Sequence, residues 1–252
     1  MTIKLTKAQT EAFRKHAEAC YPNEAVGVIS NKRYKRLENI SDSDDAFECD
    51  SRAFYGLKNV TALLHSHCFD PDSMEARNNV RRGIDERTPS VADVRLQKAL
   101  DVPMGIVACD GYQINEPVWL GVMADELIGN PFIFHIFDCF TLVRNYYKQE
   151  LNIEIVDRND TEFEWWANDD GTQGEYLDHF KEDGWIEIDP RMIEPNDVLL
   201  MQYKSTKPNH IALYKDSGTI VHHMFKNLSC EAPYSRWQTY IVKVLRYEPQ
   251  DS

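Results

Sequence analysis

Two histidines and an aspartate in this chain have the residue types and order of a zinc site. His65-Ser66-His67 ends an apolar segment, and Asp93 follows further along the chain. If residues 60–66 form a strand, His65 and His67 point the same way, because side chains alternate along a strand. Three protein ligands with one open position for water are typical of catalytic zinc. Glu24 would then act as the general base that takes a proton from that water.

Each part of this pattern also has an ordinary structural explanation. A single His-x-His is more often a surface or core pair than a metal site. Ser90-x-x-Asp93 is also a capping box at the start of a helix. Taken alone, Glu24 would be an ordinary exposed carboxylate. The conjunction of order, residue types and a preceding apolar strand favours the zinc site.

The same residues resemble the motif of the JAMM (MPN-plus) zinc metallopeptidases. The matching order is Pro22-Asn23-Glu24-x-x-Gly27, His65-x-His67 and Ser90-x-x-Asp93. The resemblance implies zinc as cofactor, His65, His67 and Asp93 as its ligands, Glu24 as acid/base, and Ser90 as a group that stabilises the tetrahedral intermediate.

One departure from that motif concerns spacing. Residues 68–89 separate the second histidine from Ser90, a longer gap than in the commonest form of the motif. The charged stretch 75–88 is expected to be a loop or insertion. Closing a longer loop adds only a modest entropic cost, so the ligands can still converge. We also expect this stretch to cover or gate the site. Cys68 is a further candidate ligand, but strand alternation predicts that its side chain points to the opposite face from His67.

A second candidate centre is a cysteine at the start of a helix. Asp138-Cys139 opens a predicted amphipathic helix over 138–150. A thiol in the first turn lies at the positive end of the helix dipole, which lowers its pKa. A nucleophilic thiol needs a base, for which His210 and either His222 or His223 are candidates. The plain alternative is a buried cysteine with structural histidines.

The choice between His222 and His223 depends on a predicted β-hairpin around Asp216-Ser217-Gly218. A three-residue loop with glycine in the left-handed conformation is a common hairpin connection. This loop places His222 on the same face as His210, and His223 on the other. A four-residue loop would reverse the choice.

The cysteine half resembles the NlpC/P60 family of papain-like cysteine peptidases. The matching residues are Asp138-Cys139, Asn209-His210-Ile-Ala-Leu-Tyr and Val221-His222-His223. The resemblance implies Cys139 as nucleophile, His210 as base and His222 as the group that orients the base. Peptidoglycan stem peptides are the implied substrates. Asn196-Asp197-Val198-Leu199 replaces the usual Pro-Gly-Asp-Val turn, and Phe134-His135-Ile136-Phe137 departs from the small, glycine-containing approach to the cysteine.

The two halves together resemble the tail-tip proteins of lambda-like bacteriophages. That likeness implies a peptidase made in the host cytoplasm, bound to other tail-tip proteins, and carried by the particle to the periplasm. The competing hypothesis is a non-enzymatic assembly scaffold that uses both folds as docking modules. In a third hypothesis, the protein has only the thiol peptidase activity, because the 68–89 segment disables the zinc site.

The helices and strands predicted from the sequence indicate an α+β chain of two domains. Residues 1–120 are expected to form a JAMM/MPN-like α/β domain, and residues 121–252 a papain-like domain, with the boundary at the breakers of 116–130. The first domain has a predicted helix at 5–20, strands at 25–29, 60–66 and 104–108, and a helix at 91–100. The second has a helix at 138–150, a partly exposed helix within 165–181, and strands at 185–188, 197–201, 210–214, 219–224 and 240–245.

Composition excludes several classes of function. The net charge is −13 and no Lys/Arg cluster is long enough to follow a phosphate backbone, which argues against nucleic-acid binding. The six cysteines form no CxxC pair and are expected to be reduced thiols. The sequence predicts no signal peptide and no membrane span.

Overall fold

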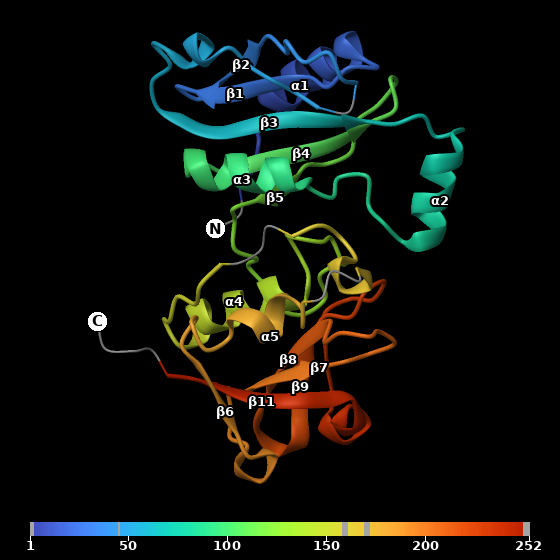
Figure 1. The fold of residues 1–252 in the computed structure, drawn as a ribbon. Coiled ribbons are helices and arrows are strands. Elements are labelled where there is room, and N and C mark those ends of the chain that lie inside the picture. The colour runs from blue at the N-terminus through green and yellow to red at the C-terminus, as the bar shows by residue number, and fades with distance from the viewer. Residues whose placement is uncertain (1–2, 45, 158–160, 169–171, 249–252) are drawn as a thin grey trace. The chain divides into compact units, whose positions relative to one another are not determined.

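The computed structural model describes residues 3–44, 46–157, 161–168 and 172–248. Its contacts divide the chain into two compact units, Met1–Met123 and Ala124–Ser252, which are coloured blue to green and green to red in Figure 1. The sequence prediction put the boundary after residue 120. Both units combine helices with one sheet, so the chain is a mixed α and β structure.

The first unit is built on a mixed five-stranded sheet with the order β2-β1-β3-β4-β5. Strands β3 and β4 are parallel and all other neighbours are antiparallel. Parallel neighbours need a long crossover, which here contains α2 and α3. The elements are α1 (Lys7–Cys20), β1 (Val26–Ser30), β2 (Arg33–Leu37), β3 (Val60–Cys68), α2 (Met74–Arg82), α3 (Val91–Leu100), β4 (Met104–Cys109) and β5 (Val118–Leu120).

Helix α1 covers one face of this sheet and confirms the predicted N-terminal helix. Its capping box is formed by Thr6 and Gln9, each of which accepts a hydrogen bond from the backbone N–H of the other. The buried Phe13, worth about 2 kcal/mol on burial, packs in one apolar cluster with Leu64 of β3. Alternation along β3 therefore turns His65 to the opposite face, and Figure 1 shows α3 on the side of the sheet away from α1.

The charged stretch 75–88 is not only a loop, because it contains most of α2. Ser73 caps this helix by accepting a hydrogen bond from the N–H of Ala76 at 3.0 Å. Gly83 ends it in the left-handed conformation, with φ of 70°. Only Ala76 of this helix is buried, so the stretch lacks the apolar periodicity from which a helix is normally predicted.

The second unit carries an antiparallel six-stranded sheet with the order β10-β9-β8-β7-β11-β6. Helix α4 precedes the strands in the chain and packs against β8 and β9. No helix in the described part of either unit is long and apolar enough to cross a membrane. The elements are α4 (Cys139–Glu150), α5 (Glu175–His179), β6 (Trp185–Ile188), β7 (Val198–Met201), β8 (His210–Tyr214), β9 (Thr219–His222), β10 (Cys230–Pro233) and β11 (Ile241–Tyr247).

The segment 165–181 is less helical than predicted. Its described residues form a 3-10 turn, Trp165–Ala167, and the short helix α5, while residues 169–171 lie outside the described part of the chain. Gly174, just before α5, has φ of 100°, a conformation that interrupts a right-handed helix.

The predicted hairpin between β8 and β9 is confirmed, with Gly218 in the left-handed conformation (φ 74°). Ala212 pairs with His222 across the two strands. Because residues two apart on a strand share a face, His210 and His222 lie on the same face. His223 follows on the other.

Candidate functional site

Cys139 begins α4, directly after a buried aspartate that caps the helix. One oxygen of Asp138 accepts hydrogen bonds from the N–H and the hydroxyl of Thr141, at 2.8 and 2.9 Å. The other accepts from the N–H of His135 at 2.8 Å. These bonds fix the turn before the helix and the first turn of the helix together. The thiol is therefore held at the helix N-terminus that the sequence predicts.

His210 and His222 form a buried hydrogen-bonded pair, here called the histidine pair. Nε2 of His210 lies 3.1 Å from Nδ1 of His222, and the two residues are 4% and 3% exposed. Trp237 packs edge-on against the His222 ring, with the ring centroids 4.5 Å apart. His223 instead has Nε2 3.1 Å from the carbonyl oxygen of Asn227. The geometry therefore favours His222 over His223 as the partner of His210.

Cys139 and His210 both line a cavity of about 330 Å³ whose walls are mainly aromatic and aliphatic side chains. His223 also lines this cavity, whereas His222 is not among its lining residues and contacts His210 instead. The hydroxyl of Tyr176 lies 3.6 Å from Sγ of Cys139. The backbone N–H of Ile211, next to His210, also reaches the thiol. Because Nε2 of His210 faces Nδ1 of His222, Nδ1 of His210 is the ring nitrogen that this contact does not use.

Burial opposes the lowering of the Cys139 pKa that is expected from the helix dipole. Burial and the charge of Asp138 raise the pKa of Cys139 to about 11. Burial and the neighbouring histidines hold the pKa of His210 well below its usual value, and burial lowers the pKa of His222 to about 4. Near pH 7 the resting site therefore holds a neutral thiol and neutral rings, and proton transfer must accompany attack.

Two aromatic residues of this site have no sequence motif. Tyr176 approaches the thiol from α5, and Trp237 covers the second ring of the histidine pair. The only signal for Tyr176 was the aromatic and acidic character of 165–181, which predicted a helix rather than a site.

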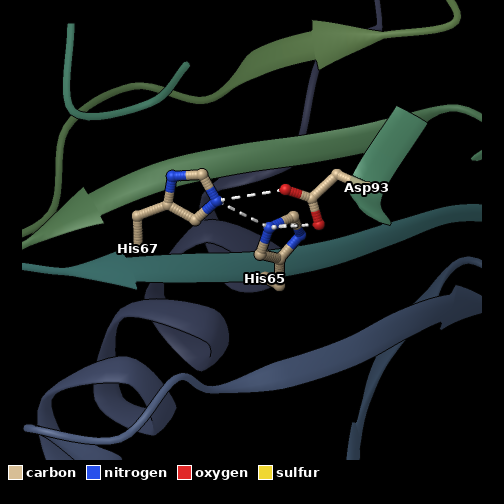
Figure 2. Close-up of side chains that lie close together, drawn as sticks. All are labelled: His65, His67 and Asp93. Carbon is tan, nitrogen blue, oxygen red and sulfur yellow. Dashed lines mark hydrogen bonds and ion pairs between the residues drawn. The ribbon is translucent and has the colours of Figure 1, made fainter. Parts of the chain in front are cut away.

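His65, His67 and Asp93 converge into a group that could hold a metal ion, here called the metal cluster, with the histidines on β3 and the aspartate in the first turn of α3 (Figure 2). The two Nε2 atoms are 3.1 Å apart. The Asp93 oxygens lie 3.3 Å from Nε2 of His65 and 3.4 Å from Nε2 of His67. Imidazole nitrogens and a carboxylate oxygen are donors that zinc binds in proteins.

Outer contacts orient these donors. Nδ1 of His67 lies 2.8 Å from the carbonyl oxygen of Glu86. A proton on Nδ1 satisfies this contact and leaves the lone pair of Nε2 facing the cluster. The hydroxyl of Ser90 donates to Asp93 at 2.8 Å, within the capping box of α3. Burial disfavours a charged Asp93, yet the two imidazoles outweigh it and lower its pKa, so the carboxylate is ionised. The donor set therefore fits a divalent cation.

Glu24 shares a cavity of about 440 Å³ with His67, Asp93 and Ser90. The side-chain amide of Asn39 donates to the backbone carbonyl of Glu24 at 2.9 Å, which helps to fix the segment that carries it. All five residues proposed for the zinc site therefore lie in one region of the first unit.

The segment 68–89 forms a wall of this second cavity. Glu75, Asn79 and Glu86 line it, and the side-chain amide of Asn79 donates to the Glu86 carboxylate at 3.3 Å. Cys68 directs its thiol to the carbonyl oxygen of Asn23 at 3.3 Å. That contact agrees with the expected orientation away from the metal cluster.

Both halves of the chain are similar in sequence to a phage protein. Tail tip assembly protein K of Escherichia phage N15 is 28% identical over 251 residues, covering 94% of this chain and 93% of that protein. Tail tip assembly protein K of Escherichia phage lambda is 34% identical over 150 residues, covering 59% of this chain and 70% of that protein.

The second unit also matches a described family. The model of the NlpC/P60 family matches residues 121–246. A solved structure from Staphylococcus aureus, described as similar to lipoprotein, NLP/P60 family, has 17% identity and a TM-score of 0.34, covering 49% of this chain and 38% of that chain. With the family model matched over half of its residues, the chain belongs to the NlpC/P60 family.

Proposed function

We propose that this protein is a phage tail-tip assembly protein whose second unit is a thiol peptidase. The observation that carries the proposal is that His210, which is hydrogen-bonded to the buried His222, lines the same cavity as Cys139. Its relatives of phages N15 and lambda are named as tail tip assembly proteins, which supports other tail-tip proteins as partners.

In the proposed reaction, Sγ of Cys139 attacks the carbonyl carbon of a peptide bond while its proton passes to Nδ1 of His210. His222 holds the proton on Nε2 of His210 and so fixes the tautomer that can act as base. The proton then goes to the leaving amine, which departs as the carbonyl re-forms in an acyl-thioester. Water, deprotonated by His210, hydrolyses that ester and restores the thiol.

The substrates we propose are peptidoglycan stem peptides, as implied by membership of the NlpC/P60 family. The protein would be made in the host cytoplasm, join the tail tip, and meet peptidoglycan in the periplasm. The aromatic wall of the cavity offers apolar contact area to a bound peptide.

Incubation with purified sacculi tests this activity. The wild-type chain is expected to release stem-peptide fragments, and Cys139→Ala is expected to release none above a buffer control. Release at equal rates by the two proteins would eliminate Cys139 as the nucleophile. Cys230→Ala is a suitable matched control, because Cys230 lies on β10 and is absent from the lining of the thiol cavity.

For the first unit we propose a JAMM-like zinc peptidase fold and site, supported by the convergence of His65, His67 and Asp93. Bound zinc would supply Lewis-acid activation of a water and of the scissile carbonyl. Glu24 would hold the proton removed from the water, and Ser90 would orient Asp93 and assist at the tetrahedral intermediate. The substrate class is an amide bond, either in a tail protein or in a peptide branch.

Metal content tests this second site directly. Zinc near one per chain is expected in protein purified without chelator, and a double alanine variant of His65 and His67 is expected to contain none. Equal zinc content in the two proteins would refute the ligand assignment. Cys68→Ala is the control that should keep its zinc, because that thiol faces the carbonyl of Asn23.

A further inference from the structure

A tyrosine hydroxyl beside the nucleophile has no part in the reaction described so far. Tyr176 places its phenol oxygen 3.6 Å from Sγ of Cys139. The residue comes from α5, remote in sequence from both Cys139 and the histidine pair. We propose that Tyr176 is a further catalytic residue, which donates its O–H to the oxyanion that forms when the thiol attacks the carbonyl. This inference rests on the proposed thiol peptidase activity.

The position of the hydroxyl fits the place where charge develops. Attack forms a bond between Sγ and the carbonyl carbon, and the π-electron pair moves onto the carbonyl oxygen. That oxygen then lies two bonds from Sγ, so a donor that contacts Sγ in the resting site can reach it. The backbone N–H of Cys139, in the first turn of α4, has no acceptor within the helix and also approaches the thiol. The oxyanion would thus receive one backbone and one side-chain donor, as oxyanion holes typically provide.

The phenol is held in place before any substrate arrives. The ring of Tyr176 packs edge-on against Trp165, with centroids 5.4 Å apart. Trp165 in turn lies so close to Gly174 that a Cβ there would come within 2.7 Å of its ring. Such a prepositioned donor needs no reorganisation when charge appears, which is what makes oxyanion stabilisation effective.

The phenol also keeps its proton. Burial and the neighbouring Cys139 and Asp138 raise the pKa of Tyr176 well above its usual value. The hydroxyl therefore remains a donor throughout the pH range in which a cysteine peptidase works. Because it stays protonated, it does not compete with His210 for the proton of the thiol.

Tyr176→Phe is the direct test, because it keeps the ring that packs on Trp165 and removes only the hydroxyl. With the full-length protein and a soluble stem peptide, we expect kcat to fall about 10²- to 10³-fold, with KM within about twofold. The matched control is Tyr146→Phe, whose hydroxyl donates to Asn196 on another side of α4. It is expected to retain wild-type kcat.

A stem-peptide aldehyde separates oxyanion stabilisation from a purely structural role. The thiol adds to the aldehyde to give a hemithioacetal whose oxygen occupies the oxyanion position, so Tyr176→Phe should bind this probe more weakly by a factor similar to the loss of kcat. An unchanged kcat, or a rise in KM with unchanged aldehyde affinity, would overturn the role of Tyr176 alone. Absence of any Cys139-dependent cleavage by the wild-type chain would instead overturn the proposed function, and this inference with it.

Discussion

Replacing His222 with alanine tests how far the thiol site depends on the second ring of the histidine pair. The substitution removes the acceptor 3.1 Å from Nε2 of His210. It also opens the space beside Trp237, whose ring is packed against His222. His210 then keeps its place on β8 but loses the contact that fixes its tautomer and its rotation.

The structure sets the size of the effect. Both rings are almost fully buried, so water does not readily replace the lost acceptor. When His210 accepts the thiol proton, its bond to His222 becomes a hydrogen bond from a charged group, worth about 1.5–3 kcal/mol. At about 1.4 kcal/mol per factor of ten in rate, kcat/KM should fall about 10- to 150-fold. The free energy of unfolding should fall by about 1–3 kcal/mol, because a buried donor is left unsatisfied.

Initial rates of stem-peptide release, with chemical denaturation of the same preparations, measure both quantities. His222→Asn can still accept from Nε2 of His210 and should recover most of the lost rate. His223→Ala should lose less than His222→Ala, because Nε2 of His223 faces the carbonyl of Asn227 instead. A larger loss of kcat/KM in His223→Ala than in His222→Ala would refute the assignment of the pair.

Further outcomes follow from other contacts. Asp197 is 2% exposed and accepts two hydrogen bonds of 2.8 Å from Arg246, whose own side chain is partly exposed. Arg246→Met should lower the free energy of unfolding by about 1–3 kcal/mol, because the buried carboxylate loses these donors. A denaturation midpoint equal to that of the wild type would contradict this. Burial holds the pKa values of the histidine pair below 6.5, so the folded form takes up protons less readily than the unfolded chain. The contribution of the histidine pair to stability should therefore be constant above pH 6.5 and fall as the pH drops below it. If the stability difference between the wild type and a His210/His222 double variant rose on acidification from pH 6.5, the sign would be the opposite. Added zinc should raise the thermal unfolding midpoint of the first unit in the wild type but not in the double alanine variant of His65 and His67. Equal changes of the midpoint in the two proteins would show that zinc binds at another site. If the chain acts as an enzyme during infection, Cys139→Ala should support tail assembly in a phage that lacks the wild-type protein, yet fail to restore infectivity to the wild-type level. Full complementation by this variant would favour the scaffold hypothesis.

The elements that the sequence predicts well are those defined by local chemistry. The three-residue loop Asp216-Ser217-Gly218 sets the register of the hairpin, and that register places His222 beside His210. The strand that carries His65-Ser66-His67 follows from an apolar run, and the capping box at Ser90 follows from residue spacing. In each case the determining residues lie within a few positions of one another.

Predictions fail where distant parts of the chain decide the outcome. The dipole of α4 acts on Cys139 locally, but the burial that raises its pKa is created by strands and segments far along the sequence. Tyr176 reaches the thiol at the start of α4 from α5, 37 positions along the chain, and no periodic pattern encodes that contact. Helix α2 is not predictable for a different reason, since its two caps stabilise a helix that buries almost no apolar surface.

The contact between Glu86 and His67 has a consequence for how this chain can vary. The acceptor is a backbone carbonyl, which every amino acid possesses, so residue 86 can be exchanged without loss of the contact. What must be preserved is the path that returns the chain from Gly83 to the α3 cap at Ser90. Relatives with an intact site should therefore tolerate diverse sequences in this segment but few insertions or deletions between these two points. Alignment gaps there would report on the metal cluster more faithfully than the residue at position 86.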